Sequence, residues 1–258
     1  IKQVQAENPG QVLVLDAGDF SMGTLAHTLF RQEAAELRLL EMMGYDATTF
    51  GNHEFDFDSD GLAAMLKSAR EKGVKMPVVA ANIGFKKGME DQSGLRWALN
   101  EYPVRPYLIV ERNGLRIGIF GLLGKDAAHD LIWGEDILLK DPVKTAQGIV
   151  KRLKDQERVD LVVCLSHAGT SPVKGHSEDE ILAAEVPDID VIISGHSHTV
   201  LSRPIIKGST VIASAGCYGA RAGVLTLRCT RGQRPVLTGY KLQAIDASIP
   251  ADAGIQKM

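Results

Sequence analysis

The chain has 258 residues, of which 45% are hydrophobic and 24% charged, and its formal net charge is −3. This composition is ordinary for a folded globular protein and excludes an intrinsically disordered one. No block of lysine and arginine suggests a nucleic-acid-binding groove, and no apolar stretch reaches the roughly 18 residues of a transmembrane helix. The length suits one large α/β domain.

Strand and helix patterns alternate along the chain. The expected strands are residues 12–15, 46–50, 77–81, 159–165 and 189–194, and the expected helices are 25–43, 59–72, 141–155 and 178–186. Asn113-Gly114 lies between two apolar runs and predicts a hairpin of residues 107–110 and 115–123. Residues 210–245 have strand character. This order predicts an α/β fold with central sheets flanked by helices.

Capping residues set the expected helix boundaries. Gly44 is placed to end the first helix, and Ser59 or Asp60 could cap the second. Asp141-Pro142 opens the third helix, with proline at an early position.

The three cysteines give little information about the compartment. Cys164, Cys217 and Cys229 are too widely spaced for a disulfide framework or a cysteine zinc site, and Cys164 is expected to be buried in an apolar strand. The sequence begins at isoleucine rather than methionine, so an export signal upstream is left open.

Polar side chains follow four of the expected strands at the point where each strand ends. These residues are Asp19 in LDAGD, Asn52, His53 and Asp56 in GNHEFD, His167 in LSHAG, and His196 and His198 in SGHSH. Ligand sites of α/β sheets gather at the carboxyl ends of strands, so we expect these side chains to converge. Any one motif alone is more often an ordinary loop, but the four together favour a functional site.

Carboxylate, amide and imidazole groups are the ligands that Zn, Mn or Fe(II) accept in proteins. A carboxylate can bridge two cations, and two cations about 3.5–4 Å apart can hold a hydroxide for displacement at phosphorus. Gly18, Gly51 and Gly195 precede the polar residues and permit tight turns. The remaining histidines, His27, His129 and His176, lack this context and are interpreted as surface or packing residues.

The motifs resemble those of the calcineurin-like metallophosphoesterase superfamily and, within it, the 5'-nucleotidase and 2',3'-cyclic phosphodiesterase family. The resemblance extends from about Val12 to Gly223. The segments that carry it are LDAGDFSMGT, MGYDATTFGNHEFDFD, PVVAANI, IGIFGLL, VDLVVCLSHAG, IDVIISGHSHT and ASAGCYGARAG. It implies a four-layer α/β/β/α sandwich that binds two divalent metal ions (Mn, Zn or Fe).

The resemblance also implies a role for each site residue. Asp19 corresponds to the carboxylate that bridges the metals. Asn52, His167 and His196 match the other ligands of one metal, and His198 matches the last ligand of the second. His53 matches the catalytic histidine, which Asp56 orients.

Two features depart from the family pattern. The family carries an Asp-x-His motif on its first strand, and none occurs before Asp19. Because IKQVQAENPG matches the helix after that motif, we expect the first strand upstream of Ile1, which leaves one metal site incomplete in residues 1–258. The family's C-terminal domain, which sandwiches the nucleobase, is not expected before Met258.

The implied activity is hydrolysis of a small phosphate ester, chiefly a nucleotide, by a metal-activated hydroxide. The alternatives are a cyclic nucleotide phosphodiesterase, a nucleotide-sugar pyrophosphatase, the sulfur-cleaving hydrolase of thiosulfate oxidation, and a non-catalytic binding protein on the same scaffold. The His53-Asp56 pair favours an enzyme, because folding requires neither residue. The resemblance favours a periplasmic, cell-surface or secreted location, and the oligomeric state is left open.

Overall fold

The computed structural model describes residues 1–88, 94–129, 131, 137–173 and 175–257. Their helices are α1 (Lys2–Glu7), α2 (Phe30–Glu33), α3 (Ala35–Met43), α4 (Asp58–Glu71), α5 (Leu95–Glu101), α6 (Lys125–His129), α7 (Pro142–Asp155) and α8 (Glu178–Glu185), with 3₁₀ turns at η1 (Leu25–Leu29), η2 (His53–Phe55) and η3 (Ile255–Lys257). Their strands are β1 (Ile83–Phe85), β2 (Tyr107–Arg112), β3 (Leu115–Leu123), β4 (Ile137–Leu139), β5 (Leu161–His167), β6 (Val191–Ser194), β7 (Ile205–Lys207), β8 (Thr210–Ala213), β9 (Arg221–Arg228) and β10 (Val236–Ala244).

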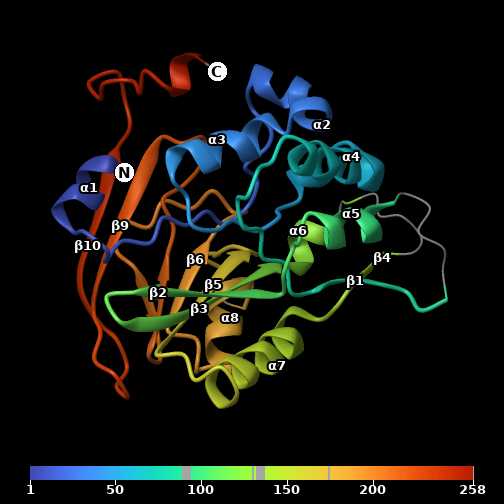
Figure 1. Ribbon diagram of the computed structural model, residues 1–258. Coiled ribbons are helices and arrows are strands. Elements are labelled where there is room, and N and C mark those ends of the chain that lie inside the picture. The colour runs from blue at the N-terminus through green and yellow to red at the C-terminus, as the bar shows by residue number, and fades with distance from the viewer. Residues whose placement is uncertain (89–93, 130, 132–136, 174, 258) are drawn as a thin grey trace.

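A six-stranded mixed sheet forms the centre of the molecule, in the order β2-β3-β5-β6-β8-β7 (Figure 1). Strands β3, β5, β6 and β8 run parallel, and β2 and β7 pair antiparallel at the two edges. The hairpin predicted at Asn113-Gly114 is confirmed, since β2 pairs with β3 up to Arg112↔Leu115. The strand expected at 159–165 is present as β5, shifted by two residues, and the strand expected at 189–194 is present as β6, which begins two residues later.

Three of the predicted strands were wrong as continuous strands. Residues 12–15, 46–50 and 77–81 run side by side but meet only at isolated parallel bridges, Leu15↔Ala47 and Thr48↔Val78. Each bridge consists of two backbone hydrogen bonds, such as Thr48 N to Pro77 O (3.1 Å) and Val79 N to Thr48 O (2.9 Å), and the pairing does not extend into a ladder. We refer to these three segments as the bridged layer.

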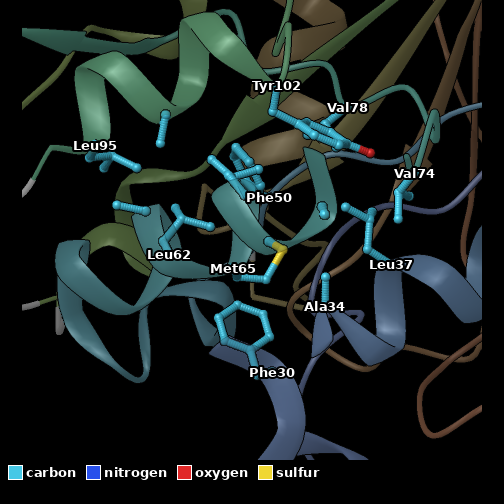
Figure 2. Close-up of a cluster of buried hydrophobic side chains, with 14 of the residues drawn as sticks. Phe30, Ala34, Leu37, Phe50, Leu62, Met65, Val74, Val78, Leu95 and Tyr102 are labelled. Atoms are coloured by element: carbon cyan, nitrogen blue, oxygen red, sulfur yellow. The ribbon is translucent and has the colours of Figure 1, made fainter. Parts of the chain in front are cut away.

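Three buried clusters define the order of the layers. Helices α2 to α5 pack on the bridged layer around Phe30, Leu37, Phe50, Leu62 and Met65, whose side chains converge in Figure 2. Successive side chains of a strand point to opposite faces of the sheet, and this alternation separates the other two clusters.

On β5, alternate side chains enter different clusters. Val163 and Leu165 pack with Ala47 and Val79 of the bridged layer, whereas Val162 and Cys164 pack with α7 and α8 on the opposite face. The molecule is therefore layered α/β/β/α, as expected, with α2, α3 and α4 on one side and α7 on the other (Figure 1). Cys164 is buried, as predicted.

The helix predicted over 25–43 is broken rather than continuous. The 3₁₀ turn η1 comes first and is followed by α2. Ala34 then has a left-handed backbone (φ 45°, ψ 43°), which separates α2 from α3. Gly44 ends α3 in the left-handed conformation, as predicted. Helix α4 begins at Asp58, so neither Ser59 nor Asp60 is its cap. Asp141 caps α7 by accepting from Lys144 N, with Pro142 next to it, as predicted.

The β-rich end predicted at 210–245 is confirmed as β8 and the antiparallel pair β9–β10. Its Leu225 and Leu227 pack against the cluster between the bridged layer and the sheet. Within the described part of the chain, no helix has the length and apolar character needed to cross a bilayer.

Candidate metal centre

The predicted site residues lie in turns that follow the bridged layer and the sheet strands. His167 is the last residue of β5, and His196 follows β6 after one glycine. Asp19 and His196 have positive φ angles of 56° and 64°. A left-handed backbone is uncommon outside glycine, so the surrounding structure holds both residues in these turns.

The structure brings four of the predicted side chains together. His167 Nε2 lies 3.0 Å from Asp19 Oδ2 and 3.2 Å from Asn52 Oδ1. His196 Nδ1 lies 3.1 Å from the same Asn52 oxygen, and the two imidazole rings are 5.2 Å apart. We call Asp19, Asn52, His167 and His196 the four-residue group.

The two imidazole rings of this group are oriented as metal-binding histidines are. His167 Nδ1 lies 2.7 Å from the Ala17 carbonyl oxygen, and His196 Nε2 lies 3.2 Å from Asp126 Oδ2. In each ring one nitrogen therefore faces an outside acceptor, which leaves the other nitrogen for the centre of the group. Within the described part of the chain, no group of three or more His, Cys, Asp and Glu residues could hold a metal ion. The group is complete only with the Asn52 amide oxygen, and the four donors then fit a divalent cation.

Gly51 and Gly18 allow the turns to approach one another. A β-carbon at Gly51 would lie 2.2 Å from Asp19 Oδ1 and 2.5 Å from His167 Cε1. Gly18 has φ +88°, and its β-carbon would lie 2.7 Å from Gly51 N. Any larger residue at these positions would push the four-residue group apart.

Asp19 and His167 form a largely buried carboxylate–imidazole pair. Burial alone would lower the pKa of His167, but the hydrogen bond and the charge of Asp19 outweigh it and raise this pKa. Burial alone would raise the pKa of Asp19. The hydrogen bond and charge of His167, together with the hydrogen bond from the His53 backbone N–H, outweigh burial and lower this pKa below its usual value. The carboxylate is therefore ionised and available as a ligand at neutral pH.

Glu54 holds together the turns that carry Asp19 and Gly51, a role that was not predicted from the sequence. Its carboxylate is fully buried and accepts the backbone N–H groups of Asp19 (3.0 Å), Ser21 (2.9 Å) and Gly51 (2.6 Å). Burial, together with the nearby charge of Asp19, raises the pKa of Glu54 to about 7. The signal was its place inside GNHE, between residues that had been assigned roles.

His53 and Asp56 lie beside the four-residue group. His53 Nδ1 is 3.0 Å from both carboxylate oxygens of Asp56, and the His53 backbone N–H donates to Asp19 Oδ1 at 2.8 Å. On the other side of Asp56, His27 Nε2 lies 3.8 Å from Oδ2, and the His27 ring stacks on Phe57 with centroids 4.8 Å apart. His27 is thus a packing residue next to the site.

His198 is not joined to the four-residue group by a hydrogen bond or ion pair within the described residues. Its ring lies edge-on against Tyr218, with centroids 5.4 Å apart. Its φ of 53° again marks a tightly held turn. Asp126, which contacts His196, was absent from the predicted site because no motif pointed to it.

Comparison with known proteins assigns the chain to a family. Residues 1–200 match the family model of the calcineurin-like phosphoesterases, and the chain belongs to this family.

Among curated relatives, the chain is 32% identical to the trifunctional nucleotide phosphoesterase protein YfkN of Bacillus subtilis over 243 residues, which cover 86% of this chain and 16% of that protein. It is 32% identical to the 5'-nucleotidase of Rattus norvegicus over 203 residues, 78% of this chain and 31% of that protein. The chain thus spans less than a third of either relative.

Among solved structures, the 5'-nucleotidase precursor of Thermus thermophilus superimposes with a TM-score of 0.78 at 28% identity. The match covers 99% of this chain and 50% of that one. The family and the metallophosphoesterase fold expected from the sequence are confirmed.

Proposed function

We propose that the protein containing this chain hydrolyses phosphate monoesters of nucleosides with the help of two divalent metal ions. The observation that carries the proposal is the four-residue group with the His53–Asp56 pair directly beside it. A set of metal-competent donors alone would also suit a structural cation. The adjacent imidazole–carboxylate pair supplies a group that can act on a bound phosphate.

In this proposal Asp19, Asn52, His167 and His196 hold one cation, and Asp19 and His198 contribute to the second. Divalent cations at such a site lower the pKa of water to give a hydroxide and polarise the phosphoryl group. The residues keep the donors in place before substrate arrives: Glu54 fixes the backbone of Asp19, and the Ala17 carbonyl fixes the His167 ring.

His53 has the geometry of a transition-state stabiliser. With Nδ1–H donated to Asp56, the Nε2 atom is left for the substrate. A protonated Nε2 donates to a phosphoryl oxygen or to the leaving oxygen as negative charge develops there. The His53 backbone N–H bonded to Asp19 keeps this ring at a fixed place relative to the metal donors.

The proposed substrate class follows from the relatives, whose names include nucleotide phosphoesterase and 5'-nucleotidase. In this proposal residues 1–258 form the catalytic domain, and selection of the nucleobase belongs to a further domain of the whole protein. The proposed location is periplasmic, cell-surface or secreted, by analogy with these relatives.

Replacement of His53 tests its role. We expect His53→Ala in the full-length protein to lower kcat by about 10²–10⁴-fold, the usual effect of losing a general acid or base, with metal content unchanged. His176→Ala, at an exposed histidine, is the matched control and should leave both quantities unchanged. Loss of a cation from the His53 variant would make His53 a ligand, and full turnover would reject its catalytic role.

A substrate panel tests the reaction class separately. The full-length protein is assayed with nucleoside monophosphates, cyclic nucleotides, nucleotide sugars and an aryl phosphate, with Mn²⁺ or Zn²⁺ and with chelator. We expect hydrolysis of a nucleoside 5'-monophosphate that chelation abolishes. Activity on the aryl phosphate alone would reject the nucleotidase but keep the phosphoesterase. No activity on any of them with both metals bound would favour a non-catalytic binding protein.

A further inference from the structure

Asp126 contacts a residue of the four-residue group although it lies outside every recognised motif. Its Oδ2 is 3.2 Å from His196 Nε2, the ring nitrogen that faces away from Asn52. The Asp126 side chain is 82% exposed, whereas the His196 side chain is 21% exposed. The carboxylate therefore reaches the outer edge of an imidazole whose inner edge faces the site.

The backbone that carries Asp126 is fixed on two sides. The Glu178 carboxylate, in the first turn of α8, accepts the N–H groups of Lys125 (2.9 Å) and Asp126 (2.8 Å). Gly124 N donates to the His167 carbonyl at 2.9 Å, and a β-carbon at Gly124 would lie only 2.5 Å from Ala168 Cα. The start of α6 is thus held against both α8 and the end of β5.

We propose that Asp126 is a positioning residue for His196. It accepts the Nε2–H of the ring, which selects the tautomer whose Nδ1 lone pair faces the centre of the four-residue group. A carboxylate on the distal nitrogen also makes an imidazole a more basic ligand. This inference rests on the proposed function, since it assigns Asp126 to the same metal site, and Glu178 is the residue that holds Asp126 in place.

The exposure of Asp126 separates this role from a contribution to folding. A hydrogen bond to a carboxylate exposed to this extent contributes little to stability, because water competes for it and screens it. Removing the carboxylate should therefore leave the metal-free fold unchanged. The effect should appear in the affinity for the cation, which depends on the orientation of the ring.

Titration calorimetry with Mn²⁺ alone, on the full metal-free protein, tests the proposal. We expect Asp126→Ala to raise the Kd for Mn²⁺ by about 10–100-fold, the range found when such an outer partner is lost. Asp126→Glu should restore most of the affinity, and Asp126→Asn part of it, because each keeps an oxygen acceptor. Asp155→Ala removes another exposed aspartate, one paired with Lys151 on α7, and should have no effect.

Two further measurements distinguish a loss of metal affinity from a loss of folded structure in Asp126→Ala. The thermal midpoint of the metal-free Asp126→Ala variant should equal that of the wild type, and its turnover should recover when Mn²⁺ is added in excess. Wild-type Mn²⁺ affinity in Asp126→Ala would overturn the inference, as would a lost affinity that Asp126→Glu does not restore. If the wild type itself binds no Mn²⁺, the proposed function fails first, which is a distinguishable result.

Discussion

The N-terminal and C-terminal halves of the chain supply the residues of the four-residue group by different means. The second half supplies His167 and His196 from β5 and β6, which are joined by a continuous parallel ladder from Val163↔Val191 to Ser166↔Ser194. The first half supplies Asp19 and Asn52 from the bridged layer, whose segments meet only at single bridges.

Side-chain carboxylates in the first half replace part of the missing ladder. Asp46 accepts Val14 N at 2.8 Å, Asp16 accepts Gly18 N at 3.0 Å, and Glu54 accepts the N–H groups around the site. The second half also buries a carboxylate near the site, Asp179 of α8, and burial raises its pKa to about 7 as well. The Ser166 and Ser194 hydroxyls lie beside Asp179 and act against this rise in its pKa. Glu54 therefore joins separate backbone segments of its half, and we expect that Asp179 is not needed in the same way, because the ladder between β5 and β6 already joins the second half.

Loss of the Glu54 carboxylate should have the largest effect. In the presence of chelator at pH 8, we expect Glu54→Ala to lower the free energy of unfolding by about 3 kcal/mol or more, because three backbone N–H groups lose a charged acceptor. Denaturant unfolding measures this change. Glu71→Ala, at an exposed glutamate that ends α4, should change it by about 0.5 kcal/mol or less. Equal stability of the two variants would contradict the carboxylate's role.

A methyl group at the contact between the halves should have the next largest effect. Gly51→Ala places a carbon 2.2 Å from Asp19 Oδ1, so we expect a loss of about 1–3 kcal/mol and greatly weakened Mn²⁺ binding. Gly148→Ala is the matched control, because Gly148 lies inside α7 with open space around it. That change should stabilise the protein by about 0.5–1 kcal/mol. Unimpaired Mn²⁺ binding in Gly51→Ala would refute the close approach.

Replacement of Asp179 should have the smallest effect and the opposite sign. The folded-state pKa, about 7, lies above the ordinary 3.8, so the folded protein retains this proton between the two values. The associated stability is present below about pH 4 and is lost as the pH rises to about 7. We expect Asp179→Asn to remove this loss and to stabilise the protein at pH 8 by about 1.4 kcal/mol. This is about a third of the stability linked to a shift from 3.8 to about 7, because burying the asparagine amide has a cost of its own.

Urea unfolding of wild type and Asp179→Asn at pH 5 and pH 8 gives the required comparison. Glu54 titrates in the same range, but its contribution cancels in the difference between the two proteins. A variant less stable than wild type at pH 8 would show that Asp179, like Glu54, holds its half together.

The sequence was most informative where local pattern decides structure. Apolar runs located β5 and β6, Asn113-Gly114 located the hairpin, and Asp141-Pro142 located the start of α7. The convergence of the four-residue group was also predicted, because polar side chains follow the ends of four apolar runs, although Asp19 and Asn52 follow the bridged layer rather than the central sheet. Whether these four residues bind metal is still a prediction.

The errors arose where distant contacts decide. The apolar pattern of the bridged layer predicts three strands, because such a pattern does not show that pairing stops after one bridge. The left-handed break at Ala34 carries no local sign, since alanine favours a helix. Asp126 and Glu178 act on residues 52 or more positions away, so no spacing rule could place them near the site.

The long sequence separations within the site determine when it can form. His167 and His196 contact Asn52 across 115 and 144 positions, and His167 meets Ala17 across 150. Closing loops of this length costs conformational entropy that only a nearly complete core offsets, so these contacts form late in folding. A cation bound there would stabilise molecules that have already folded and would not direct the folding of the chain. Such a cation slows unfolding and leaves the rate of folding almost unchanged.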